Sequence, residues 1–117
     1  MARFDIDLGE IRNMASFHEV FGRTLKFFDG YGRNMDAWID CMTSVDAVAD
    51  GLTTVTVPRG ELLVLRIDDP LDFKRRCPEQ YDALIECSAF VKFRRADIVE
   101  PPVLALLLNG RYEPRYT

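Results

Sequence analysis

Two carboxylates, Asp36 and Asp40, have the spacing in this chain that most suggests a chemical role. On a helix, residues four apart lie one above the other on the same face, about 6 Å apart along the axis at a rise of ~1.5 Å per residue. That separation resembles the spacing of successive phosphates on a single nucleic-acid strand. A carboxylate can accept two hydrogen bonds from an arginine that would otherwise hold a phosphate. The pair is therefore interpreted either as a substrate mimic or as an ordinary solvated helix face.

A short loop followed by a helix must position these two carboxylates. Gly30 and Gly32 flank Tyr31, so the backbone can take positive φ on either side of the ring. Asn34 is a good N-cap, because its side chain can accept a hydrogen bond from a free N–H of the first turn. The apolar residues that follow fall within a sector roughly 120° wide, which predicts an amphipathic helix as far as about residue 48. These apolar residues are Met35, Trp38, Ile39, Met42 and Val45.

A strand and a helix are predicted before this loop. Residues 4–8 alternate apolar and acidic side chains, which is typical of a strand with one buried face. Ser16 and Glu19 have the spacing of a capping box, and apolar residues recur at helical intervals after them as far as about Phe27. His18 is predicted to be a partly buried member of this helix and not a catalytic base. The phenylalanines of the segment are interpreted as core residues; they are Phe17, Phe21, Phe27 and Phe28.

Three extended segments and two helix starts are predicted after the acidic helix. Residues 53–57 are β-branched throughout and predict a strand. Residues 62–67 and 103–108 are nearly continuous apolar runs, which predict strands covered on both faces. A proline follows Asp69 and another follows Cys77, and each marks the first turn of a helix. This order predicts an α/β domain in which helices pack on a small, mainly parallel sheet.

The composition indicates one domain with an acidic surface. The chain has 117 residues, enough to bury its own core, with 48% hydrophobic and 29% charged residues. Its net charge of −4 and pI of about 4.9 disfavour nucleic acid as a direct partner and favour a basic protein. The basic runs at residues 74–76 and 94–95 are expected to be solvated helix faces. No apolar run approaches the ~18 residues of a membrane span, and the N-terminus has no apolar signal core, so we expect no membrane span and a cytoplasmic location.

The potential metal ligands and catalytic groups form no known motif. Cys41, Cys77 and Cys87 are widely spaced, and with one histidine they make no zinc site. We expect free thiols in a reducing compartment and no cofactor. Catalysis by Asp36 and Asp40, as in a glycosidase, is disfavoured because two groups one turn apart on an exposed helix face each other poorly across a substrate. The chain is therefore not expected to be an enzyme.

A family signature is visible in residues 31–41, which read Tyr-Gly-Arg-Asn-Met-Asp-Ala-Trp-Ile-Asp-Cys. This run resembles the signature of the barstar family, the intracellular inhibitors of the ribonuclease barnase, whose pattern is roughly Tyr-Gly-x-Asn-Leu-Asp-Ala-Leu-Trp-Asp. The resemblance covers about the first 45 residues and continues in the order of the elements. It implies one domain over residues 1–117 with three parallel strands and four helices. Residues 53–57 would be an added antiparallel edge strand, and residues 111–117 a polar tail.

The resemblance also implies a function and a set of partner contacts. The chain would occlude the active site of a ribonuclease, or of a related basic toxin enzyme, as an immunity protein or antitoxin does. Asp40 matches the carboxylate that enters the phosphate site of the nuclease, and Asp36 matches its acidic neighbour. The expected partner-binding residues are Gly30, Tyr31, Gly32, Asn34, Asp36, Ala37, Ile39, Asp40 and Thr43.

Several residues depart from the family pattern. Gly30 replaces a bulky aromatic residue that stacks on the catalytic histidine of the enzyme, and Arg33 is basic where the prototype is acidic. Trp38 and Ile39 reverse the usual order, which moves the indole toward the core. Glu86 is the nearest candidate for an acidic contact on the last helix. These departures leave a second interpretation open: an orphan protein-interaction or regulatory domain with the same fold and no nuclease target.

Overall fold

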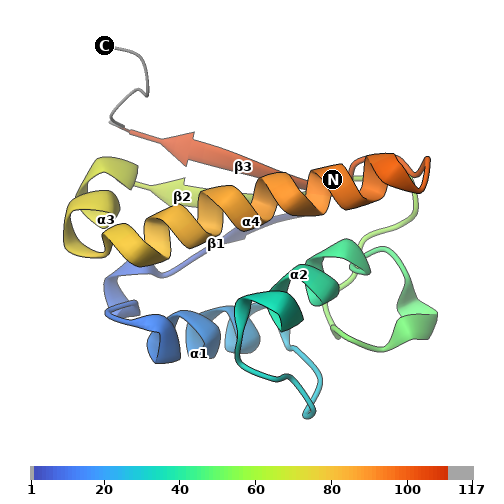
Figure 1. Ribbon diagram of the computed structural model, residues 1–117, viewed down its shortest axis with the longest axis horizontal. Coiled ribbons are helices and arrows are strands. Elements are labelled where there is room, and N and C mark those ends of the chain that lie inside the picture. Colours follow the sequence, from blue (N-terminus) through green and yellow to red (C-terminus); the bar gives the residue numbers. More distant parts are fainter. Residues whose placement is uncertain (1, 111–117) are drawn as a thin grey trace.

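The apolar run near residue 63 forms the central strand of a three-stranded sheet. In the computed structural model, which describes residues 2–110, β2 (Leu63–Asp68) lies between β1 (Ala2–Asp5) and β3 (Leu104–Asn109), and both pairings are parallel (Figure 1). Leu63, Leu65 and Ile67 are fully buried. The predicted α/β class, with three parallel strands and four helices, is confirmed.

Four α-helices of the described residues cover this sheet. They are α1 (Met14–Leu25), α2 (Met35–Thr43), α3 (Pro70–Arg76) and α4 (Pro78–Asp97), with 3₁₀ turns at Leu8–Glu10 and Val48–Asp50. Figure 1 shows the long α4 running along the strands, with α1 and α2 grouped together at one side. Phe17 and Phe21 of α1 pack against Trp38 of α2, and all three are fully buried. The indole therefore lies in the core, as predicted. None of the described helices is long and apolar enough to cross a membrane.

The first strand is shorter than predicted. It ends at Asp5, and Leu8 already belongs to a 3₁₀ turn. Arg76 of α3 holds this turn, since its guanidinium donates to the Leu8 and Ile11 carbonyl oxygens at 3.1 and 3.3 Å. Arg76 is nevertheless exposed, as predicted for residues 74–76, with 37% of its side chain accessible.

Both ends of α1 differ slightly from the prediction. The capping box is formed by Asn13 and Ser16, because Asn13 Oδ1 accepts from the Ser16 N–H at 2.9 Å and Ser16 Oγ accepts from the Asn13 N–H at 3.0 Å. The helix therefore starts at Met14 and does not use the predicted Ser16–Glu19 box. It ends at Leu25, where Lys26 takes the left-handed conformation with φ 53°.

The predicted strand at residues 53–57 is wrong. Only Thr53 forms a β-bridge, antiparallel with Phe27. The next two N–H groups, of Thr54 and Val55, donate to the carbonyls of Lys26 and Leu25 at the end of α1. These β-branched residues therefore pair with the end of α1 and form no regular strand within the described part of the chain.

The last strand is confirmed but lies at an edge of the sheet. Leu107 is 44% exposed, so the prediction of a strand buried on both faces is wrong for β3. The predicted polar tail at residues 111–117 lies outside the described residues.

Candidate partner-binding face

The start of α2 is held by the side chain of Asn34. Its Oδ1 accepts from the Ala37 N–H at 2.8 Å, which confirms the predicted N-cap. Its Nδ2 donates to the Gly32 carbonyl at 3.3 Å. One side chain therefore fixes both the first turn of the helix and the loop before it.

The two glycines of the loop serve a different purpose from the predicted one. Neither has positive φ; the left-handed residue of the loop is Arg33, with φ 53°. A Cβ on Gly30 would lie 2.6 Å from the Phe28 ring, and one on Gly32 would lie 3.1 Å from Asn34 Nδ2. A Cβ at either position would therefore require a neighbouring side chain to move.

Phe28 is the aromatic residue that the sequence interpretation misplaced. Its side chain is 39% exposed and its ring lies against Gly30, so its assignment to the core is wrong. Phe17 and Phe21 are fully buried as predicted, whereas Phe27 is half-buried and packs on Tyr31. Phe28 thus puts an exposed ring next to the position where the family signature has an aromatic residue.

Tyr31 connects the loop to α1. Its hydroxyl lies 2.5 Å from Nδ1 of His18, which is only 3% exposed. Burial, with a smaller effect from the nearby Arg33, lowers the pKa of His18, and burial raises the pKa of Tyr31. Both groups are therefore neutral near pH 7, and the Tyr31 hydroxyl can donate to an unprotonated Nδ1.

Both acidic residues of α2 point outward. Asp36 is exposed and has no hydrogen bond or ion pair with the described residues. Asp40 is also exposed, but its Oδ1 lies 2.8 Å from Nη1 of Arg94 on α4. The side chains of Arg94 and Asp40 remain 41% and 57% exposed, so this pair stays in contact with water. Its 54-residue sequence separation explains why spacing patterns did not reveal it.

The remaining predicted contacts are less accessible. Ile39 is only 8% exposed and belongs to the core. Ala37 and Thr43 are half-buried, and the Thr43 hydroxyl donates to the Ile39 carbonyl at 2.7 Å. We define the α2 face as the half-buried Tyr31 together with the exposed residues of the loop and helix, which are Phe28, Gly30, Gly32, Asn34, Asp36 and Asp40.

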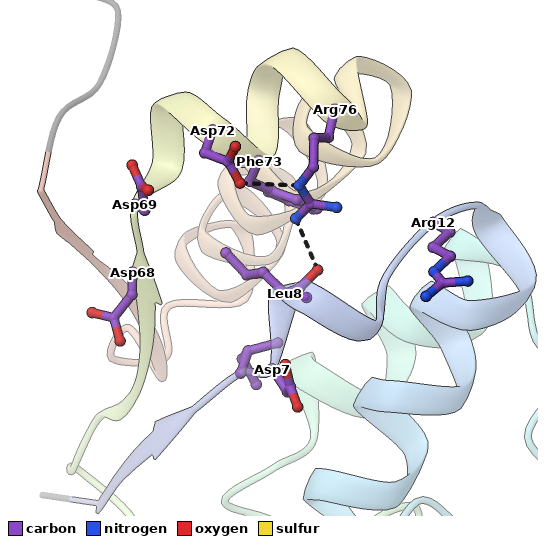
Figure 2. A pocket seen from close by; sticks show the side chains of 10 residues that line it. Asp7, Leu8, Arg12, Asp68, Asp69, Asp72, Phe73 and Arg76 are labelled. Atoms are coloured by element: carbon purple, nitrogen blue, oxygen red, sulfur yellow. Dashed lines mark hydrogen bonds and ion pairs between the residues drawn. The ribbon is translucent and has the colours of Figure 1, made fainter.

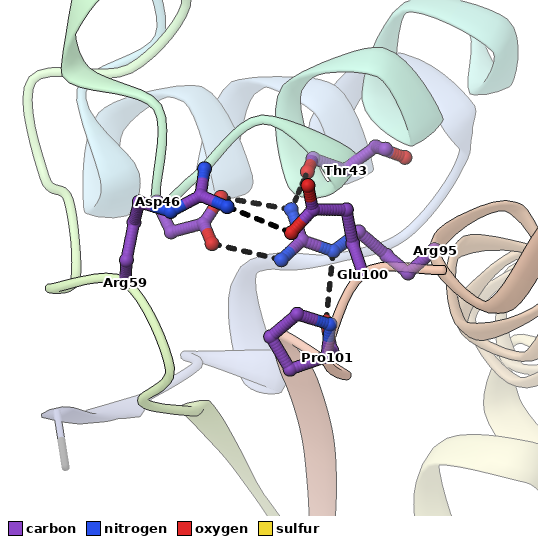
Figure 3. Close-up of polar contacts among 6 residues, drawn as sticks. All are labelled: Thr43, Asp46, Arg59, Arg95, Glu100 and Pro101. Carbon is purple, nitrogen blue, oxygen red and sulfur yellow. Dashed lines mark hydrogen bonds and ion pairs between the residues drawn. The ribbon is translucent and has the colours of Figure 1, made fainter. Parts of the chain in front are cut away.

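A buried ion pair fixes the far end of α2. Arg95 of α4 makes two contacts of 2.8 Å with the carboxylate of Asp46, and the two side chains are 5% and 1% exposed (Figure 3). Arg95 also donates to the Thr43 carbonyl at 3.2 Å and to the Pro101 carbonyl at 2.9 Å. The prediction that residues 94–95 form a solvated helix face is therefore wrong for Arg95.

A separate pocket of about 650 Å³ lies away from this face (Figure 2). It opens where β1 and β2 end and α3 begins, and it is lined by the charged residues Asp7, Arg12, Asp68, Asp69, Asp72 and Arg76. Arg76 is already paired with Asp72 at 3.0 Å. A hydrogen bond from Asn109, together with Arg66, lowers the pKa of Asp68. Within residues 2–110, no group of His, Cys, Asp and Glu has a geometry that could hold a metal ion.

Comparison with known families gives a match. The profile of the family described as Barstar (barnase inhibitor) matches residues 1–96, which is most of the 117-residue chain. A comparison with curated proteins found none that matches. The matched region contains the whole α2 face and nearly all of α4.

Proposed function

The chain belongs to the barstar family, and on this premise we propose that it inhibits a ribonuclease by occluding its active site with the α2 face. The observation that carries the proposal is the exposed pair Asp36 and Asp40 on an ordered helix. Ribonuclease active sites hold phosphates with basic side chains, and a carboxylate can replace a phosphate in such contacts. The net charge of −4 favours a basic enzyme as the partner.

The local structure supports this role because the face is ordered before any partner binds. Asn34 caps the helix and holds the loop, and Tyr31 anchors the loop to His18. Groups that are already fixed lose little conformational freedom on docking. The inhibitor would therefore retain most of the free energy of its new contacts.

The contact between Asp40 and Arg94 is compatible with the proposal. An exposed ion pair of this kind is worth roughly 0–1 kcal/mol, so exchanging Arg94 for a basic residue of the enzyme costs little. The pair also holds the Asp40 carboxylate at the surface of α2. We propose that Phe28 contributes the aromatic contact of the loop, since its ring lies exposed against Gly30.

The proposal is tested by titrating the purified chain into barnase and other secreted ribonucleases of the same type, with cleavage of an RNA substrate as the readout. We expect at least one enzyme to be inhibited at an equimolar ratio. Asp40→Ala removes a charge-assisted contact, so the dissociation constant of that complex should rise roughly tenfold to a hundredfold.

A matched control separates this contact from a general loss of negative charge. Asp82 is also an exposed aspartate on a helix, but it lies near the start of α4, and Asp82→Ala should inhibit as well as the wild-type chain. The proposal fails if no ribonuclease is inhibited, or if Asp40→Ala and Asp82→Ala behave alike. Failure of this kind would favour an orphan interaction domain.

A further inference from the structure

The two edges of the sheet differ in how well they are protected against pairing with a strand of another molecule. β1 has four residues, and the exposed Arg3 and Asp5 place charges on it. β3 has six residues and carries no charge between Leu104 and Leu108. Within residues 2–110, no other strand pairs with the outer side of β3. Charges and short length commonly protect a strand against edge-to-edge pairing. By these criteria β1 is protected and β3 is not.

The hydrogen bonds to β2 identify the free backbone groups of β3. Leu63 donates to the Val103 carbonyl at 2.8 Å, and Asp69 donates to the Asn109 carbonyl at 2.9 Å. Backbone groups alternate in direction along a strand, so the odd-numbered residues of β3 face β2. The N–H and C=O groups of the three even-numbered residues therefore point away from the sheet; these are Leu104, Leu106 and Leu108.

Apolar surface borders this free edge. The side chains of Leu104 and Leu106 are half-buried and line a groove of about 420 Å³ between β3 and α4. Ile85 and Ala89 form the helix side of the groove, and Lys92 is the only charged residue that lines it within residues 2–110. A strand added to β3 would cover these leucines, while the flexible stem of Lys92 can keep its charge in water.

We propose that β3 pairs antiparallel with β3 of a second copy of this chain, giving a continuous six-stranded sheet. With the two-fold axis at Leu106, this residue pairs with Leu106 of the second copy, and Leu104 pairs with Leu108 of the second copy. Each pair exchanges two hydrogen bonds, so every outward backbone group of the three leucines finds a partner. The paired leucines of both copies lie on the α4 side and close the two grooves together.

A second copy fits this edge because the edge is complementary to itself. The same three residues supply donors and acceptors in a symmetric order, and no like charges meet between Leu104 and Leu108. A two-fold contact of this kind forms a closed dimer. The charges and short length of β1 prevent further growth of the sheet at the other edge. Figure 1 shows β3 on the side of the molecule opposite the loop before α2, so the α2 face stays free in the dimer.

Sedimentation equilibrium of the full chain over a dilution series tests this proposal. We expect twice the monomer mass of 13.4 kDa at high concentration and dissociation on dilution. Leu106→Pro removes an N–H that points away from β2 and makes no bond within residues 2–110, and proline is tolerated at such edge positions. The variant should keep the far-ultraviolet circular dichroism of the wild type and raise the dimer dissociation constant roughly tenfold or more.

Two further variants make the result decisive. Leu106→Lys places a charge on the edge and should also yield monomers, which decides the question if the proline variant does not fold. Phe93→Ser removes a 63% exposed ring of α4 and should leave the dimer intact. A chain that stays monomeric, with its edge either open or covered by its own residues 111–117, overturns the proposal. So does a dimer that survives both Leu106 substitutions or is lost in Phe93→Ser.

Discussion

His18 and Tyr31 show how one contact between two residues can order a binding loop. The imidazole is almost completely buried in α1, and the phenol comes from the loop before α2. Because burial and Arg33 both lower the pKa of His18, protonation of the folded protein is unfavourable. A charged imidazole could no longer accept the Tyr31 hydroxyl hydrogen at Nδ1, so acid should weaken the anchor of the loop.

This contact predicts a defined dependence of stability on pH. The unfolded chain protonates His18 near its ordinary pKa of 6.5, whereas the folded chain protonates it only at lower pH. The unfolded state therefore binds more protons in this interval, and the free energy of unfolding should fall as pH decreases below about 6.5. Urea denaturation at about pH 7.5 and about pH 5.5 measures the change.

The matched variant is His18→Gln, which keeps a polar side chain but cannot titrate in this range. Its free energy of unfolding should change less between the two pH values than that of the wild type. Equal changes in both proteins would show that other groups cause the pH dependence.

Local patterns at the residue scale predicted only part of the candidate site. Asn34 as N-cap, the buried indole of Trp38 and the outward direction of Asp36 follow from spacing within one helix, and the structure has all three. The contact of Asp40 with Arg94 joins residues 54 positions apart, so no local pattern contains it. The close approach of Phe28 to Gly30 depends on the loop conformation, which propensities do not specify.

At the scale of secondary-structure elements, two ion pairs with the same contact distance connect the α2 region to α4. Asp40–Arg94 and Asp46–Arg95 both have N–O distances of 2.8 Å, but the first pair is exposed and the second is buried. Distance therefore does not distinguish them, and burial should determine how much stability each pair provides. Removing one partner of a buried pair leaves an uncompensated charge in the interior.

We expect Asp46→Ala to lower the free energy of unfolding by about 3–5 kcal/mol, because Arg95 would stay buried without its carboxylate. Asp40→Ala should cost less than about 1 kcal/mol, since Arg94 remains hydrated. Urea denaturation of the two variants under identical conditions gives the comparison. Similar losses in both variants would contradict the assigned roles.

The same buried pair explains why α2 is shorter than the sequence predicts. The apolar periodicity continues to Val45 and predicts a helix to about residue 48, but α2 ends at Thr43. Arg95 donates hydrogen bonds to the Thr43 carbonyl and to the Asp46 carboxylate. These contacts draw the chain after Thr43 toward the interior. A basic residue from a distant helix thus overrides the local pattern.

At the scale of the whole molecule, the order of elements predicted the parallel sheet correctly, because parallel strands require the intervening helices. It did not predict which strand lies at an edge. Residues 62–67 and 103–108 have similar apolar composition, yet among the described strands β2 is central and β3 lies at an edge. Strand order is decided by packing among all elements, and that information is not contained in either run.

The overall charge leads to a prediction about how the proposed complex forms. The chain has a net charge of −4, and the two aspartates of the α2 face add local negative potential. Opposite charges accelerate the encounter with a basic enzyme. Salt screens this attraction at separations beyond the Debye length, which is about 10 Å at 0.1 M ionic strength. For any ribonuclease that the chain inhibits, we therefore expect the association rate constant to fall as sodium chloride is raised from low concentration to about 0.5 M.

Stopped-flow mixing at a series of salt concentrations measures this rate. Asp36→Asn offers a sharp comparison, because Asp36 is exposed and has no ionic partner among the described residues. The variant should associate more slowly than the wild type at low salt and approach the wild-type rate at high salt. Its dissociation rate should change much less if Asp36 acts mainly in the encounter. An association rate that does not respond to salt in either protein would show that the acidic charge of the chain does not guide binding.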